Sequence, residues 1–303
     1  MIQQLKTIIE ETAKTVPGPL GIGFKDLNSG ETLFYNGDMV FPMASVYKIF
    51  VLCELFRKQK EGSFSFADRH TLLESDKRIG SGILELIGEG AVLSMMDYTM
   101  LMMVISDNTS TSLLQQYTPA EDIRANLIEP LGLKDDTLFV PGAGLCDYYG
   151  VTVEEYKKIT SEGGRFHARN GSYFRCAEPV NKQSSPRDLL KLLSLLHEGH
   201  LVDDDSDHQI LNIMNKCQTN NRIPKLLPPG VRVAHKTGSI DHLANDCGIV
   251  CTDCGDYVLT LFYNGNLASE EEYEGSEWTA VGDRVLSELS AQVYRIFTDH
   301  YRK

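Results

Sequence analysis

The sequence predicts an α+β protein: an antiparallel five-stranded sheet flanked by N- and C-terminal helices, with an all-helical domain inserted into it. Three observations lead to this fold class. Strand-like alternation occurs near the N-terminus and again near the C-terminus, the long segment between them has helical periodicity, and both ends of the chain have the pattern of amphipathic helices. The strands of one sheet therefore come from both ends of the chain, and the insert packs beside them.

The N-terminal part predicts a helix followed by a hairpin. The apolar residues of the helix recur at three- and four-residue spacings: Ile2, Leu5, Ile8 and Ile9. Prolines at positions 17 and 19 end this helix. Apolar residues then alternate in 22–24 and 33–35, on either side of the turn residues 28–30, which is typical of a β-hairpin.

The C-terminal part repeats this plan in reverse order. Strand-like runs at 231–240, 247–251 and 257–263 are separated by turn residues. A final helix carries apolar residues at helical spacing: Val281, Val285, Leu289, Val293, Ile296 and Phe297. The three strand-like runs complete the sheet, and the helix packs against it.

The middle of the chain is mostly helical, and one of its helices opens at Ser185-Pro186. We therefore predict a discontinuous sheet domain, residues 1–44 and 216–303, and an all-helical domain, residues 45–215. An active site is expected in the cleft between the two.

Composition excludes several classes of protein. The chain has 303 residues, 42% apolar and 23% charged, as in an ordinary globular protein. A formal net charge of −13 argues against a nucleic-acid partner, and no segment approaches the ~20 apolar residues that span a bilayer. As it stands the sequence shows no signal peptide, so we expect a cytoplasmic protein, or a periplasmic or secreted one if an export signal has been removed. The sequence shows no obvious exposed apolar stripe, so we expect the protein to be a monomer.

The cysteines and histidines leave one alternative open. Cys251 and Cys254 form a C-x-x-C with Cys247 nearby, which fits a zinc or redox site. No second pair of ligands with similar spacing follows, so a strand, a turn and another strand explain these residues better. His235 on a strand and His242 in a turn lack, in sequence, the partners of a metal site or a triad. No metal or organic cofactor is implied.

Ser45 and Lys48 are candidates for nucleophilic catalysis. They form an S-x-x-K motif at the start of an apolar run, so the serine lies near a helix N-terminus and the lysine lies on the same face one turn later. A buried lysine with a lowered pKa is a competent proton acceptor for a serine hydroxyl. Taken alone, the motif is better explained by a helix start with an exposed lysine, because about one S-x-x-K is expected by chance in a chain of this length.

Two further motifs strengthen this hypothesis. Ser106-Asp107-Asn108 follows a buried apolar run, and Lys236-Thr237-Gly238 lies in a strand whose glycine permits a close approach. Each has an ordinary alternative, a helix cap and turn for the first and an edge strand with a lysine for the second. Their occurrence together, in this order, is hard to attribute to coincidence.

The three motifs resemble the S-x-x-K, S-D-N and K-T-G signature of class A β-lactamases and penicillin-binding proteins. The similarity extends to the stretches GSGILEL, MMVISDNTSTSLL and NNRIPKLLPPGVRVAHKTGSIDHLANDCGIV, and to the helix opening SSPRDLLKLL. It implies a β-lactamase/transpeptidase-like fold. It also implies a small-molecule substrate, either a β-lactam or a D-alanyl-D-alanine-like peptide.

The resemblance also implies roles for individual residues. Ser45 attacks the acyl carbonyl, Lys48 takes its proton, and Ser106 relays a proton to the leaving nitrogen while Lys236 holds it by charge. The substrate-binding residues are Asn108, Thr237, Gly238 and Ser239. The backbone N–H groups of Ser45 and Ser239 form the oxyanion hole. Neither Arg222 nor Arg232 can be placed in the site from sequence.

One element of the class A pattern is absent from the sequence. The glutamate of an E-x-x-L-N segment, which activates the deacylating water, has no match ahead of Ser185, and segment 141–183 matches poorly. Glu178 is the nearest candidate for a general base. The remaining carboxylates of this segment are weaker candidates: Glu154, Glu155 and Asp147.

The deacylation step separates three functional hypotheses. A β-lactamase needs a base from the rebuilt segment 141–183. A D-alanyl-D-alanine peptidase or esterase could deacylate with Lys48 or Ser106, but such a protein would be exported. A binder or sensor would be acylated by a β-lactam or a peptidoglycan fragment and stay so. We favour the β-lactamase.

Overall fold

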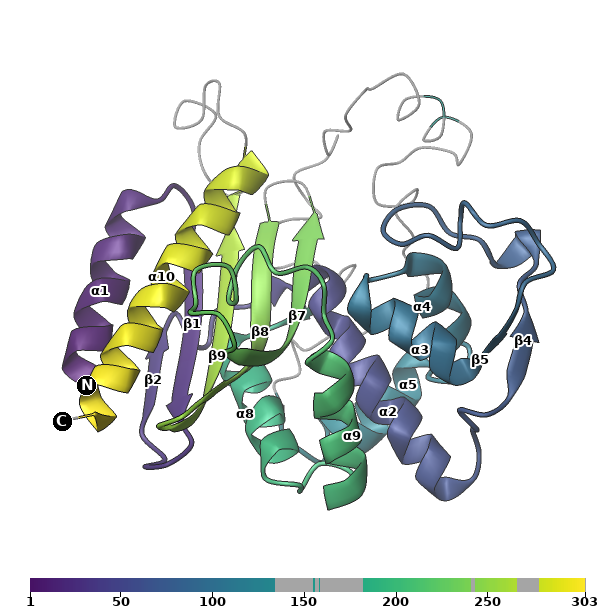
Figure 1. Ribbon diagram of the computed structural model, residues 1–303, viewed down its shortest axis with the longest axis horizontal. Helices are drawn as coiled ribbons and strands as arrows, with labels where there is room; N and C mark the ends of the chain where they lie inside the picture. Colours follow the sequence, from purple (N-terminus) through teal and green to yellow (C-terminus); the bar gives the residue numbers. More distant parts are fainter. Residues whose placement is uncertain (134–154, 156–157, 159–181, 241–242, 266–277, 303) are drawn as a thin grey trace.

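Figure 1 shows the computed structural model, which describes residues 1–133, 155, 158, 182–240, 243–265 and 278–302. The helices are α1 (Ile2–Thr15), η1 (Ala44–Tyr47), α2 (Lys48–Glu61), η2 (Glu74–Asp76), α3 (Met95–Val104), α4 (Asn108–Leu114), α5 (Ala120–Ile123), η3 (Arg124–Ile128), α8 (Pro186–His197), α9 (Asp204–Met214) and α10 (Trp278–Tyr301). The strands are β1 (Leu20–Asp26), β2 (Thr32–Tyr35), β3 (Phe41–Pro42), β4 (Arg69–Thr71), β5 (Val92–Ser94), β6 (Gln183–Ser184), β7 (Arg232–Ile240), β8 (Leu243–Thr252) and β9 (Gly255–Asn264).

The main sheet has five strands in the order β2-β1-β9-β8-β7, and every neighbouring pair is antiparallel. The N-terminal hairpin joins the C-terminal strands through β1 and β9, which pair along their length from Leu20 opposite Tyr263 to Asp26 opposite Tyr257. This arrangement confirms the predicted sheet and its origin from both ends of the chain. It leaves β7, the strand of the K-T-G motif, at one edge.

The terminal helices α1 and α10 lie side by side over one face of the sheet (Figure 1). A buried apolar cluster joins the two helices to the sheet. It includes Leu5 and Ile9 of α1, Phe24 of β1, and Phe297 of α10. Burying apolar side chains of this size is worth about 1.5–3 kcal/mol each, so this cluster anchors both ends of the chain. The predicted flanking helices are confirmed.

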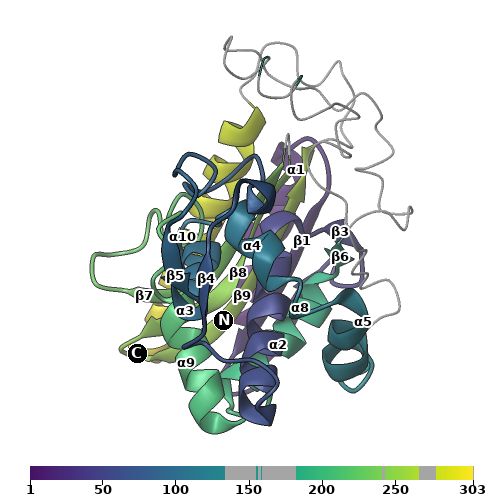
Figure 2. The same cartoon turned by 90° about the vertical axis from the view of Figure 1, so that its right-hand side faces the viewer.

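The other face of the sheet packs against the inserted segment (Figure 2). A second apolar cluster includes Ala234, Ile249 and Phe262 from the sheet together with residues of the inserted helices, Phe50 and Leu189 among them. Helix α8 begins as predicted: Ser185 caps it, accepting a hydrogen bond from the N–H of Asp188 (3.2 Å), and Pro186 is its first residue.

The inserted segment and the residues just before it contain short strands that the sequence did not indicate. Strand β4 pairs with β5, and β3, just before Ser45, pairs with β6, just before α8. Two- and three-residue strands carry too little periodicity to be recognised from sequence. The β3–β6 pair matters for function because it ties the chain leading to Ser45 to the start of α8.

The helices that the structure describes include none that is both long and apolar enough to span a membrane.

Candidate active site

Ser45 lies in η1, a single tight turn that runs directly into α2, so it occupies the predicted position at a helix start. Two strands hold this turn in place. A Cβ atom at Gly238 would lie 2.3 Å from the carbonyl oxygen of Met43 and 3.1 Å from the nitrogen of Ser45, so only glycine permits β7 to approach this closely. From β8, the amide of Asn245 donates to the carbonyls of Pro42 (2.8 Å) and Met43 (3.1 Å).

Lys48 is fully buried and joins the first two motifs. Its ammonium donates to the carbonyl oxygen of Ser106 (2.7 Å), to Ser106 Oγ (3.0 Å) and to Asn108 Oδ1 (3.0 Å). Burial lowers the pKa of Lys48 well below its ordinary value, and the charges of Lys236 and Lys182 lower it further, against the opposing effect of Asp107. Loss of one proton would leave the amine with a lone pair, which is the form that accepts a proton from a serine.

Ser106 occupies a strained position between two helices. It follows α3 with φ at 61°, in the left-handed region that few non-glycine residues adopt. The next residue, Asp107, caps α4. The S-D-N motif therefore forms a turn with a helix cap, as its ordinary alternative predicts. It is also part of the site, because the turn directs Ser106 and Asn108 toward Lys48.

Asp107 holds this turn with both of its carboxylate oxygens. Oδ1 accepts from the N–H of Ser110 (2.8 Å), and Oδ2 accepts from the N–H groups of Ile83 (2.7 Å) and Leu84 (3.0 Å). Asn108 makes two further bonds to the same neighbouring segment, from its Nδ2 to the carbonyl of Ile79 (3.1 Å) and from its N–H to that of Ser81 (2.8 Å). The stretch GSGILEL thus supports the S-D-N turn.

Replacing Asp107 by alanine is expected to destabilise the protein by about 3 kcal/mol, because two buried N–H groups and one part-buried N–H group lose a charged acceptor. Urea unfolding followed by circular dichroism measures the change. Asp97→Ala provides the comparison, since Asp97 also bonds a helix-capping serine but at an exposed position. An Asp107→Ala effect no larger than that of Asp97→Ala would contradict this role.

Lys236 is fully buried in β7 beside the Ser45 turn. Its ammonium donates to the carbonyl oxygen of Thr237 (2.9 Å), and burial lowers its pKa to about 8. Thr237 is buried as well, whereas Ser239 is exposed. The third motif therefore lies against the first, as the resemblance implies.

Arg222 lies in the site, although the sequence could not place it. Its guanidinium is fully buried and donates to the carbonyls of Gly238 (2.8 Å) and Asn245 (2.6 Å) and to Ser239 Oγ (2.5 Å). Asp283 of α10 accepts from its Nε (2.7 Å). These contacts are made across the sheet by residues far apart in sequence, so no local pattern could indicate them. Arg232, by contrast, is exposed on the rim of a separate hollow.

Lys182 is a second functional candidate that the sequence did not indicate. Its ammonium lies 3.7 Å from the centroid of the Tyr47 ring and 3.4 Å from Gln115 Oε1, and burial lowers its pKa to about 7. The backbone of Lys182 is bound to that of Met43, whose N–H donates to its carbonyl (2.8 Å). A third lysine therefore belongs to the surroundings of Ser45.

His235 has two hydrogen-bond partners that the sequence did not show. His235 Nδ1 lies 2.8 Å from Asp246 Oδ1, and its Nε2 lies 3.2 Å from Asn220 Oδ1. Burial by itself would lower the pKa of His235, but the carboxylate of Asp246 outweighs burial and raises the pKa to about 10. The partners come from the neighbouring strand β8 and from the segment between α9 and β7, which explains why the sequence did not show them.

His235 is therefore expected to remain an imidazolium at neutral pH and to titrate near pH 10 instead of near 6.5. Because its pKa is raised on folding, its contribution to stability is complete below about pH 6.5 and is lost as the pH rises through about 10. NMR of ¹⁵N-labelled imidazole measures the titration directly. A midpoint for His235 near its ordinary value of 6.5 would contradict the ion pair.

The candidate general base Glu178 lies outside the described residues, as do Glu154, Asp147 and His242. Glu155 is described and exposed. The C-x-x-C residues form a strand, a turn and a strand as predicted: Cys251 lies at the end of β8, Cys254 lies in the turn before β9, and both are free thiols. In the described part of the chain, no group of three or more His, Cys, Asp or Glu side chains is arranged to hold a metal ion.

The fold is that of the serine β-lactamases. A β-lactamase of Sphaerobacter thermophilus has a TM-score of 0.75 at 24% identity and covers 98% of this chain and 97% of its own. The protein PBP-A gives the same TM-score, identity and coverage, and an ancestral class A β-lactamase has a TM-score of 0.75 at 19% identity, covering 97% of this chain and 100% of its own.

Sequence comparison agrees. The model of the β-lactamase enzyme family matches residues 2–296, and the chain belongs to this family. β-Lactamase VEB-1 of Pseudomonas aeruginosa is 21% identical over 296 residues, 93% of this chain and 86% of that protein. A β-lactamase of Phocaeicola vulgatus is 23% identical over 282 residues, 88% of this chain and 79% of that protein. The resemblance to class A β-lactamases is confirmed.

Proposed function

We propose that the protein is a serine hydrolase that opens β-lactam rings through an acyl-enzyme on Ser45, the reaction of a β-lactamase. The observation that carries the proposal is the environment of Lys48. A fully buried ammonium, one turn after Ser45, bonds Ser106 and Asn108 and has its pKa lowered by burial and by neighbouring lysines. A buried charge of this kind is costly, and general-base chemistry accounts for it.

Acylation proceeds in two proton transfers. Neutral Lys48 removes the proton from the Ser45 hydroxyl as the oxygen attacks the lactam carbonyl, and the backbone N–H groups of Ser45 and Ser239 stabilise the oxyanion. Ser106 then passes a proton from Lys48 to the lactam nitrogen as the C–N bond breaks. The 3.0 Å bond between Lys48 Nζ and Ser106 Oγ supports this relay.

Substrate binding depends on the edge strand β7. Asn108 bonds the side-chain amide of the substrate, while Lys236 and Thr237 bind its carboxylate. The Arg222 guanidinium, which bonds the Gly238 carbonyl and Ser239 Oγ, holds this end of the strand in place. The Lys236 ammonium suits the carboxylate that penicillins and D-alanyl-D-alanine peptides share.

The rate of deacylation decides whether the acyl-enzyme on Ser45 is hydrolysed and turns over or stays acylated. Glu178 remains the candidate base for the water that releases Ser45. The second candidate function is a protein that is acylated and stays so. The observation that favours it is the lack of a match, ahead of Ser185, to the glutamate of the E-x-x-L-N segment that activates the deacylating water. A mutant of PBP-A, a fold neighbour, was solved as an acyl-enzyme complex with penicillin G.

The test is to incubate the protein with penicillin G and follow intact mass together with ring opening. Peptide mapping is expected to place the adduct on Ser45. A transient adduct with continued ring opening supports the β-lactamase, and a stable adduct supports the second candidate. A D-alanyl-D-alanine peptide, assayed in parallel for release of D-alanine, tests for peptidase activity. If neither compound acylates Ser45, the proposal is wrong.

A further inference from the structure

Lys182 contacts both ends of the turn that carries Ser45. That turn, η1, begins after Met43 and ends at Tyr47. The carbonyl oxygen of Lys182 accepts from the N–H of Met43 (2.8 Å), and its ammonium lies 3.7 Å from the centroid of the Tyr47 ring. The contact continues along the chain, because β3 pairs with β6, the strand that directly follows Lys182. The backbone and the side chain of one residue thus hold the turn of the nucleophile.

Gln115 connects this contact to the helix of the S-D-N motif. It is the C-terminal cap of α4, and its Oε1 accepts from the ammonium of Lys182 (3.4 Å) and from the hydroxyl of Tyr47 (3.4 Å). Helix α4 begins at Asn108, which bonds Lys48. Lys182 therefore contacts the S-x-x-K turn directly and the S-D-N helix through its bond to Gln115.

The charge of Lys182 strengthens these contacts and acts on Lys48. A cation over an aromatic face is attracted by the electrons of the ring, more strongly where water is excluded. Lys182 is partly buried, and burial lowers its pKa to about 7, whereas burial raises the pKa of Tyr47 and keeps its ring neutral. The charges of Lys236 and Lys182 lower the pKa of Lys48, and Asp107 opposes them.

We propose that Lys182 is a positioning residue for acylation, which holds the Ser45 turn against α4 through Tyr47 and Gln115. The inference rests on the proposed function, in which Ser45 is the nucleophile and Lys48 is its base. A nucleophile held in one geometry reacts faster than one that is free to move. The positive charge of Lys182 also favours the neutral amine of Lys48, the form that accepts the proton of the serine.

The first test compares two substitutions at Lys182. Lys182→Met keeps the length of the side chain but removes its charge and its hydrogen bond, so acylation by penicillin G below about pH 7 should slow about tenfold. Lys182→Arg keeps a positive charge that stacks on aromatic rings, and it should restore most of the rate. An unchanged rate in Lys182→Met, or an equal loss in both variants, overturns the proposal.

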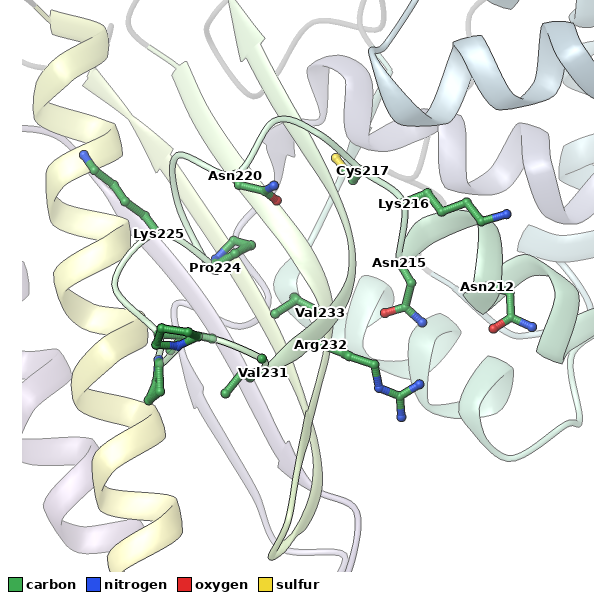
Figure 3. A pocket seen from close by; sticks show the side chains of 14 residues that line it. Asn212, Asn215, Lys216, Cys217, Asn220, Pro224, Lys225, Val231, Arg232 and Val233 are labelled. Carbon is green, nitrogen blue, oxygen red and sulfur yellow. The ribbon is translucent and has the colours of Figure 1, made fainter.

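Lys225→Met is the control for these two variants. Lys225 is an exposed lysine in the wall of the surface hollow on whose rim Arg232 lies (Figure 3). None of the residues that line this hollow belongs to the Ser45 turn or to α4. The loss of this lysine should therefore leave the rate of acylation unchanged.

The pH profile separates positioning by charge from a merely structural role. Lys182 loses its charge as the pH rises through about 7, so the ratio of the unmodified rate to the Lys182→Met rate should be largest below this pH and shrink above it. The midpoint of Lys48 should move to higher pH in Lys182→Met, because a neighbouring positive charge is lost. In Lys182→Arg it should be no higher than in the unmodified protein. A ratio that is constant with pH overturns the proposal.

Two further readouts do not require penicillin to be a substrate. Carbon-13 NMR of the lysine Cε atoms measures the titration of Lys48 directly, with Lys48→Met to assign its signal. In urea unfolding, the losses of stability in Lys182→Met and Tyr47→Leu should sum to more than the loss in the double variant, because both remove the same contact. Additive losses with an unshifted Lys48 midpoint overturn the positioning role even if Ser45 is acylated. Coupling in both readouts without any acylation supports the contact and refutes the proposed function instead.

Discussion

Ser45→Ala is expected to abolish acylation by penicillin, with no mass adduct and a loss of at least about a thousandfold in ring opening. The residual rate should be small because the remaining groups cannot form the covalent intermediate. Ser45 is half-buried at the start of α2, and alanine fits the same turn, so the variant should fold normally. Intact mass spectrometry and a chromogenic ring-opening assay measure the effect.

Ser63→Ala is the matched control for this variant. Ser63 is an exposed serine just after the other end of α2, and its removal should leave both readouts unchanged. A Ser45→Ala protein that still acquires one penicilloyl group would refute Ser45 as the nucleophile. In that case peptide mapping would identify the residue that carries the adduct.

Lys48→Met is expected to slow acylation by about 100- to 10,000-fold, the range found for removing a general base. Methionine occupies a similar volume but cannot accept a proton. Two effects on stability oppose each other: a costly buried ammonium is removed, while Ser106 and Asn108 lose its hydrogen bonds. We therefore expect a melting temperature close to that of the unmodified protein, so the loss of activity reflects chemistry and not unfolding.

The pH dependence of acylation provides a second readout for Lys48. Its pKa is lowered by burial and by the charges of Lys236 and Lys182, so acylation should rise as the ammonium loses its proton and level off well below the ordinary titration range of lysine. Lys60→Met, an exposed lysine of the same helix, is the control and should alter neither rate nor profile. A Lys48→Met protein with a normal acylation rate would contradict the assigned role.

Local patterns in the sequence predicted most of the secondary structure that frames the site. Turn residues at 28–30 and apolar alternation on either side predicted the first hairpin, and Ser185-Pro186 predicted the start of α8. The strands β3 and β6 escaped notice because two residues carry no period. Their pairing depends on contacts between segments that lie far apart in the chain, which a local pattern cannot reveal.

By itself, the sequence determined the fold class, the family resemblance and the three motifs with the side chains of Ser45, Lys48, Ser106 and Lys236. The S-x-x-K motif can be recognised in the sequence because a nucleophile and its base can lie on the same helical turn, three residues apart. Only the tertiary structure decided what surrounds them. Arg222 reaches the site across the sheet, and Asp246 reverses the effect of burial on His235, because charge and burial act through space between residues that sequence separates.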